Sequence, residues 1–205
     1  AGKEDMFEFL EDVVEEMVPL FPGTYFHIGG DESPKEHWEK CPKCQERIRK
    51  EGLFAKDGHS AEERLQSYVI GRMEKMLAKH GKKIIGWDEI LQGGLSPDAT
   101  VMSWQGEEGG IASALQSHDV IMTPGGNGMY LDHFQGDPKV EPVTIGGLNT
   151  LEKVYNYNPV PDTLVALNKA HHILGVQCNN WSEYMYTNAQ REYMMYPRTV
   201  AVAEI

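Results

Sequence analysis

The amino-acid sequence predicts an α/β protein whose strands run parallel and are joined by helices. Three observations support this class. Strand-like and helix-like segments alternate along the 205 residues, acidic and Trp residues follow several of the strands, and no apolar run is long enough to span a bilayer. Alternation of this kind implies parallel strands connected by right-handed crossovers. It leaves two architectures open, a doubly wound open sheet and a closed barrel.

Five segments have the composition of strands. β-branched and aromatic residues dominate them, and glycines or prolines bound them. Because two glycines close the first of these segments, we expect it to be a buried strand. The five segments are Thr24–Gly30, Lys82–Ile90, Ala99–Gly106, Asp119–Gly125 and His172–Tyr184.

Five further segments have the pattern of helices, in which apolar residues recur at spacings of three and four. They are Met6–Met17, Ser60–Gly81, Gly106–His118, Val160–His172 and Asn188–Ile205. The second begins with a predicted capping box, Ser60 with Glu63, and Gly81 stands where a helix C-terminus is expected. The polar stretch before it, around GLFAKDGHSAEE, is predicted to be a surface loop.

The charge balance excludes some classes of partner. Thirty-one acidic residues outweigh 19 basic ones, giving a formal net charge of −12. Binding to phosphate backbones or to anionic lipid requires clustered Lys and Arg, so we expect no nucleic acid and no membrane partner. The basic stretch KCQERIRK is interpreted as one solvated helix face. The acidic, amphipathic first residues do not have the pattern of a signal peptide.

Cys41 and Cys44 form a CxxC pair with several interpretations. The pair fits a redox motif, half of a zinc site, a strained disulfide or two spare thiols. Zinc needs two more ligands, and His37 and His59 are the local candidates, but no second CxxC or HxxxH accompanies them. We therefore favour a pair that tethers a loop, and we expect no metal and no cofactor.

The string HIGGDE is the most specific motif in the chain. Gly29 and Gly30 allow a tight turn and leave room for a ligand, while Asp31 and Glu32 place two carboxylates at a strand end. Neighbouring carboxylates separate their pKa values, so one can serve as an acid while the other stays ionised, as cleavage of a glycosidic bond requires. The alternative is a Gly-Asp turn that only caps the next helix.

The tryptophans favour a sugar site. All four lie in or soon after a predicted strand, and Trp87 and Trp181 stand within two residues of a carboxylate. Flat indoles match the C–H faces of sugar rings. In a (β/α)₈ barrel the carboxyl ends of all strands converge on one face, whereas an open sheet uses only its switch point. Acids and aromatics after all five strands therefore favour the barrel.

FHIGGDE, GWDE, SWQG, YLD and WSE occur in this order, and the chain thereby resembles family 20 glycoside hydrolases, the β-N-acetylhexosaminidases. The resemblance runs from about Leu20 to Ile205. It implies a TIM barrel, of which this chain supplies strands four to eight with their helices. Residues 1–205 would then be the C-terminal portion of the catalytic domain. It also implies substrate-assisted, retaining catalysis, in which the 2-acetamido oxygen of the substrate is the nucleophile.

The resemblance implies roles for the acid pair and for one tyrosine. Glu32 is expected to protonate the leaving oxygen and later to activate water. Asp31 is expected to orient the acetamido group and to stabilise the charge that develops on its nitrogen. The Tyr130 hydroxyl is expected to bind the acetamido carbonyl.

The remaining predicted site residues bind the sugar. Trp87, Trp104 and Trp181 are expected to form the walls of the pocket, and Asp132 and Glu183 to accept hydrogen bonds from sugar hydroxyls. His27 is expected to support the acid pair, with core packing as the alternative.

The resemblance also implies a partner class and two alternatives. The substrates would be glycans that end in N-acetylhexosamine, which are found in the periplasm, in lysosomes and outside the cell. Five strands of a barrel leave open edges, so we expect self-association through them. One alternative is a non-catalytic sugar-binding module of the same fold. The other is an unrelated retaining glycosidase with a carboxylate nucleophile, for which Glu183 is the candidate.

Overall fold

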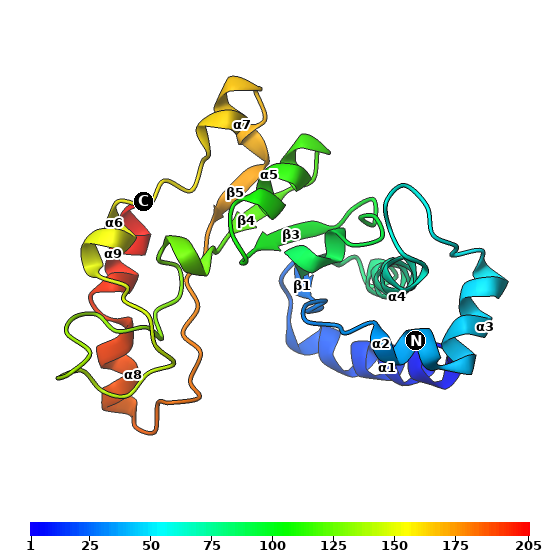
Figure 1. Ribbon diagram of the computed structural model, residues 1–205, viewed down its shortest axis with the longest axis horizontal. Helices are drawn as coiled ribbons and strands as arrows, with labels where there is room; N and C mark the ends of the chain where they lie inside the picture. The colour runs from blue at the N-terminus through cyan, green and yellow to red at the C-terminus, as the bar shows by residue number, and fades with distance from the viewer. The chain divides into compact units, whose positions relative to one another are not determined.

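The computed structural model describes residues 1–205, and Figure 1 labels its elements along the chain. Its five strands belong to one sheet, in chain order. The chain divides into two compact units, Ala1–Val101 and Met102–Ile205. β1 pairs with β2 in parallel, and so does β4 with β5. The predicted α/β class with parallel strands is confirmed. The strands are β1 (Tyr25–His27), β2 (Lys83–Trp87), β3 (Thr100–Ser103), β4 (Val120–Met122) and β5 (Ile173–Val176).

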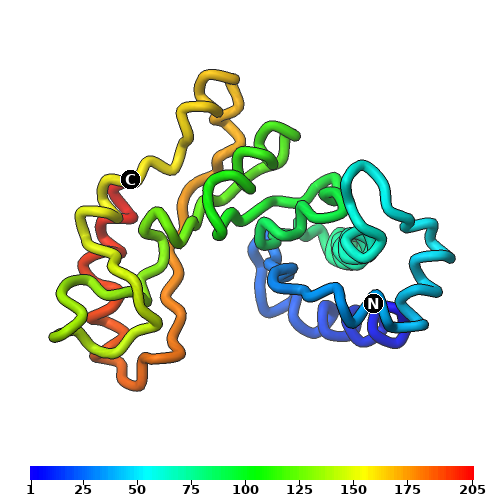
Figure 2. Tube along the Cα trace, viewed as in Figure 1, coloured from blue at the N-terminus to red at the C-terminus, as the bar shows by residue number.

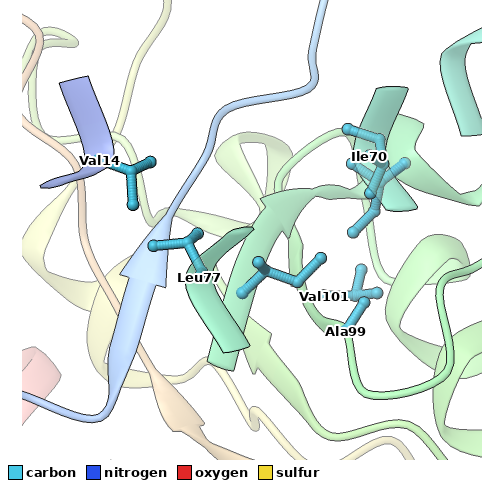
Figure 3. Close-up of a cluster of buried hydrophobic side chains, with 7 residues drawn as sticks. Val14, Ile70, Leu77, Ala99 and Val101 are labelled. Atoms are coloured by element: carbon cyan, nitrogen blue, oxygen red, sulfur yellow. The ribbon is translucent and has the colours of Figure 1, made fainter. Parts of the chain in front are cut away.

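In the first unit, helices pack around β1 and β2. They are α1 (Glu4–Met17), α2 (Glu36–Lys40), α3 (Pro42–Glu51) and α4 (Ala61–Ala78), with short 3₁₀ turns at Val18–Leu20 and Asp88–Leu91. Figure 3 shows the main core, where Val14 of α1 and Leu77 of α4 lie among apolar side chains from the strands. Each fully buried aliphatic side chain of this kind contributes about 1.5–3 kcal/mol. Only part of the apolar stripe that predicts α1 therefore faces the core, since Val14 is buried while Phe9 and Val13 are exposed.

The N-terminus of α4 carries the predicted capping box. The Glu63 amide donates to Ser60 Oγ at 3.1 Å, and the Ser60 amide donates to the Glu63 carboxylate at 2.7 Å. Two of the amides that a helix start leaves unpaired are thereby satisfied.

Ser60→Ala is expected to lower the free energy of unfolding by about 1 kcal/mol, because the amide of Glu63 loses its acceptor. Urea denaturation of the full-length protein measures this change. Ser182→Ala, at an exposed serine outside any helix, is the matched control. Equal stability of the two variants would contradict the capping role.

The second unit is built on β4 and β5. Its helices are α5 (Glu108–Leu115), α6 (Leu151–Tyr155), α7 (Asp162–Ala166), α8 (Asn188–Met195) and α9 (Arg198–Glu204), with 3₁₀ turns at Gly125–Asn127 and Ala170–His172. The long connection between β4 and α6 runs beside α8 and α9 (Figure 2). In this connection the Gln135 side chain donates to the Tyr196 carbonyl at 3.2 Å, and Val143 accepts from Gln190 at 3.4 Å.

Two expectations about the elements are wrong. The last predicted helix is two helices, α8 and α9, because Pro197 between them has no amide to continue the helical hydrogen bonding. β1 is not a buried strand: Tyr25 is 40% exposed, since the strand is first in the sheet order and pairs only with β2. The predicted loop before α4 is confirmed, whereas the sequence pattern does not predict α2.

The basic stretch is helical, as expected, but it is not wholly solvated. Arg47 of α3 is buried and donates to the Glu4 carboxylate at 2.7 Å. Arg72 of α4 donates to the other oxygen of Glu4 at 2.6 Å. Hydrogen bonds from Arg72 and Arg47 lower the pKa of Glu4 to about 2. The two arginines therefore connect α1 with α3 and α4.

The CxxC pair lies at the start of α3. Cys41 and Cys44 are free thiols, and Cys44 packs in a buried cluster with Ile48 and Leu65. Burial raises the pKa of Cys44, whereas hydrogen bonds from the backbone and thiol of Cys44 lower that of Cys41. The pair belongs to the start of a helix and not to a loop. No helix of the chain is both long and apolar enough to cross a membrane.

Candidate active site

The acid pair follows β1 on a tight left-handed turn. Gly29 and Gly30 have φ of 73° and 99°, and Glu32 itself has φ of 46°. A Cβ atom at Gly30 would lie 2.5 Å from Cγ2 of Ile90, so the backbone passes too close to the 3₁₀ turn at Asp88–Leu91 for any side chain. Glu32 occupies a conformation that L residues rarely adopt, and the surrounding structure must hold it there.

The neighbouring strand places Trp87 beside this turn. His27 pairs with Ile85 in the parallel register, and the Trp87 amide donates to the Gly29 carbonyl at 2.9 Å. The His27 and Trp87 rings meet edge to face, with centroids 4.7 Å apart. Two of the predicted site residues are therefore in direct contact, next to Asp31 and Glu32.

His27 is held as a neutral imidazole. Its Nδ1 accepts the Gly29 amide at 3.1 Å, which leaves the ring proton on Nε2. Partial burial lowers the pKa of His27, and the nearby Asp31 carboxylate offsets only part of this effect. His27 therefore supports the glycine turn before the acid pair.

Three side chains tether the backbone around Glu32. The Glu89 carboxylate accepts the Glu32 amide at 3.3 Å. The Gln66 side chain of α4 donates to the carbonyls of Gly30 at 3.0 Å and Glu89 at 3.1 Å. Lys35 donates to the Ser33 carbonyl at 2.6 Å and to the Gln66 side-chain oxygen.

Three predicted aromatic residues meet in the second unit. The Tyr130 ring stacks on Trp104 with centroids 6.3 Å apart and planes at 5°. Trp181 meets Tyr130 edge to face, with centroids 6.3 Å apart and planes at 79°. These residues follow β3, β4 and β5, so the carboxyl ends of these strands supply an aromatic wall of the kind that fits a sugar face.

Buried amides fix the backbone of Tyr130. The Asn149 side chain donates to the carbonyls of Tyr130 at 2.7 Å and Gly128 at 2.8 Å. The Leu131 amide donates to the Asn179 carbonyl at 2.7 Å. A Cβ atom at Gly125 would lie 3.0 Å from the Tyr130 ring, so the turn before Tyr130 packs closely against it. The position of the Tyr130 ring is therefore set from several sides.

Asp132 is a buried carboxylate beside the aromatic wall. It is 3% exposed, and burial raises its pKa. The Glu183 carboxylate raises it further, while His133, with Nδ1 at 3.7 Å, acts in the opposite direction. A sugar hydroxyl that donates to Asp132 would replace the hydration it has lost.

Arg198 binds the backbone of the loop that carries Asp132. This guanidinium is fully buried and donates to the carbonyls of His133 at 3.1 Å and Asn149 at 2.9 Å. It also donates to the carbonyls of Leu131 and Met194. Burial lowers the pKa of Arg198 to about 10, so it remains a cation at neutral pH. The two residues that flank Asp132 are therefore bound to the first residue of α9.

The structure thus collects the predicted residues in two groups. In the first unit, His27 and Trp87 surround the turn of Asp31 and Glu32. In the second unit, the second group gathers near Tyr130. Its other members are Trp104, Asp132, Trp181 and Glu183. Sequence reasoning missed the buried polar residues that support both groups, namely Gln66, Glu89, Asn149, Asn179 and Arg198. Glu89 alone had a signal, as the last residue of GWDE.

Carboxylates and aromatic side chains thus follow the carboxyl ends of parallel strands, where α/β proteins commonly bind their ligands. The sequence profile described as "Glycosyl hydrolase family 20, catalytic domain" matches residues 1–205. The chain therefore belongs to glycosyl hydrolase family 20, within its catalytic domain.

Individual relatives agree with this assignment. A beta-hexosaminidase of Porphyromonas gingivalis is 60% identical over the whole chain, which covers 26% of that protein. A beta-hexosaminidase of Vibrio furnissii is 36% identical over 96% of the chain and 31% of that protein. The crystal structure of a GH20 exo beta-N-acetylglucosaminidase from Vibrio harveyi, in complex with N-acetylglucosamine, is 33% identical with a TM-score of 0.82. It matches 97% of the chain and 30% of its own length, so the chain spans about a quarter to a third of these relatives.

Proposed function

We propose that the protein removes terminal β-linked N-acetylhexosamine from the non-reducing end of glycans, with retention of configuration. The observation that carries the proposal is the acid pair on its glycine turn, in a chain whose whole length matches the family's catalytic domain. The relatives named beta-hexosaminidase support it. Such glycans occur in the periplasm, in lysosomes and outside the cell, and we propose one of these as the place of action.

The first step breaks the glycosidic bond. Glu32, as the carboxylic acid, donates its proton to the leaving oxygen while the acetamido carbonyl oxygen of the substrate attacks the anomeric carbon. The products are the free leaving alcohol and an oxazolinium ion. Asp31 accepts a hydrogen bond from the acetamido N–H and stabilises its positive charge, and the Tyr130 hydroxyl donates to the acetamido oxygen.

The second step adds water. The Glu32 carboxylate takes a proton from a water molecule, whose oxygen attacks the anomeric carbon and reopens the ring. Two inversions at this carbon give net retention, and Glu32 is again an acid. The proposed role of Trp87, Trp104 and Trp181 is to contact the sugar ring, and that of Asp132 and Glu183 is to accept hydrogen bonds from its hydroxyls.

Comparison of two aryl glycosides tests the proposal in the full-length protein. We expect cleavage of 4-nitrophenyl N-acetyl-β-glucosaminide and none of the plain β-glucoside, because only the former carries the acetamido nucleophile. A thiazoline that mimics the oxazolinium ion should inhibit. Equal cleavage of both substrates would instead indicate a carboxylate nucleophile. Binding of the thiazoline without cleavage would indicate a sugar-binding module.

A further inference from the structure

A buried glutamine of α4 lies behind the acid pair without belonging to it. Gln66 is 3% exposed, and its side-chain amide bonds to two backbone carbonyls and to the ammonium of Lys35. Burying a side-chain amide destabilises the fold unless its N–H groups and its oxygen form hydrogen bonds. In Gln66 these groups face the turn of the acid pair or the residues next to it. An apolar residue at this position could fill the core but could not make these bonds.

The donors of Gln66 bind the segment before the acid pair. Nε2 donates to the Gly30 carbonyl at 3.0 Å and to the Glu89 carbonyl at 3.1 Å. Gly30 immediately precedes Asp31, and the carboxylate of Glu89 accepts a hydrogen bond from the Glu32 amide at 3.3 Å. The side-chain amide of Gln66 thus fixes both Gly30, before the acid pair, and Glu89, which binds the Glu32 amide.

The acceptor of Gln66 reaches the segment after the acid pair. Its Oε1 accepts from Lys35 Nζ, and the same ammonium donates to the Ser33 carbonyl at 2.6 Å and to Gln92 at 3.3 Å. Gln66 therefore connects to both sides of a two-residue segment in which Glu32 has φ of 46°. Such a strained residue persists only where its surroundings over-determine the backbone.

We infer that Gln66 is a positioning residue for Glu32, acting through the Gly30 carbonyl, Glu89 and Lys35. The inference rests on the proposed function, in which Glu32 is the acid. Gln66 does not touch the substrate. It holds the acid at the distance and angle from which the proton reaches the leaving oxygen, and a displacement of about 1 Å there costs about 10²-fold in rate.

Comparison of the loss of kcat on two substrates with different leaving groups tests this inference. A sugar alkoxide leaves only with a proton, whereas 4-nitrophenolate leaves readily as an anion, so a displaced acid affects the first far more. Gln66→Met keeps the side-chain length and removes the amide. We expect kcat to fall about 10²-fold on N,N′-diacetylchitobiose and about tenfold or less on the 4-nitrophenyl substrate, with KM little changed.

Two further variants sharpen the test. Ser67→Ala removes a neighbouring bond of the same kind, from the Ser67 hydroxyl of α4 to the Gly94 carbonyl at 2.7 Å, and should leave both activities within about twofold. Gln66→Glu keeps an acceptor for Lys35 but loses both donated bonds, so it should show the leaving-group signature of Gln66→Met. Equal losses on both substrates, or normal activity of Gln66→Glu, would overturn the inference.

A second measurement does not depend on activity. Amide hydrogen exchange of residues 29–35, followed by mass spectrometry, should be about tenfold or more faster in Gln66→Met than in Ser67→Ala. Equal exchange in the two variants overturns the positioning role whatever the enzyme does. If the unmodified protein cleaves neither substrate, the proposed function fails, and this exchange measurement still decides the role of Gln66.

Discussion

Replacing Glu32 with glutamine is expected to lower kcat about 10²- to 10⁴-fold on N,N′-diacetylchitobiose, whose leaving group needs a proton, with little change in the affinity for a thiazoline inhibitor. Glutamine has nearly the same shape and accepts the same backbone conformation, but it has no proton to give and cannot take one from water. Both steps of the proposed reaction therefore lose their acid or base. Steady-state kinetics and inhibitor titration on the full-length protein measure the two quantities.

Glu36→Gln is the matched control for this variant. Glu36 is an exposed carboxylate in the first turn of α2, four residues after Glu32, and the same change in charge there should leave kcat within about twofold. Activity of Glu32→Gln within about tenfold of the unmodified enzyme would show that another group protonates the leaving oxygen.

Replacing Arg198 with methionine is expected to lower the free energy of unfolding by about 3–5 kcal/mol. The four carbonyls that Arg198 serves lose charge-assisted donors, and each buried unpaired acceptor costs about 1–3 kcal/mol. The expected loss of stability is smaller than the sum of four such costs, because the variant also removes a buried cation, whose desolvation is itself unfavourable. Urea denaturation of the full-length protein measures the change.

Arg191→Met gives the corresponding control on α8. This arginine is exposed and donates to Asn188 of its own helix, so its loss should change stability by no more than about 0.5 kcal/mol. If Arg198→Met were as stable as Arg191→Met, the carbonyl contacts would contribute nothing net, and the loop of Asp132 would have to be held by its other bonds.

The sequence pattern was sufficient to predict those features that are formed by residues close together in the chain. The capping box of Ser60 and Glu63 involves residues three apart, and the glycine turn before Asp31 requires backbone angles that only glycine adopts readily. The strand-to-helix alternation likewise predicts all five strands and most of the helices. Pro197 was an available signal for the break between α8 and α9, since proline interrupts a helix.

The supporting residues could not be predicted because their partners are distant and carry no side-chain signature. Gln66 bonds to the carbonyl of a residue 36 positions earlier, and Arg198 to one 67 positions earlier. Every residue has a carbonyl, so nothing in the sequence marks the one that is chosen. Arg47 was misread for the same reason: a basic residue in a charged helix looks solvated until Glu4 is seen beside it.

The roles of the predicted site residues stay predictions, and so does self-association through the sheet edges. β1 and β5 are the terminal strands in the sheet order.

The bond from Arg198 to Leu131 also has a consequence for the nascent chain. The loop that carries Asp132 leaves the ribosome 67 residues before its guanidinium partner. At about 5–20 residues per second, it waits roughly 3–13 seconds with those carbonyls unpaired. During this interval the loop is exposed to chaperones and proteases, and synonymous codons that slow translation between Leu131 and Arg198 would lengthen its exposure without altering the amino-acid sequence.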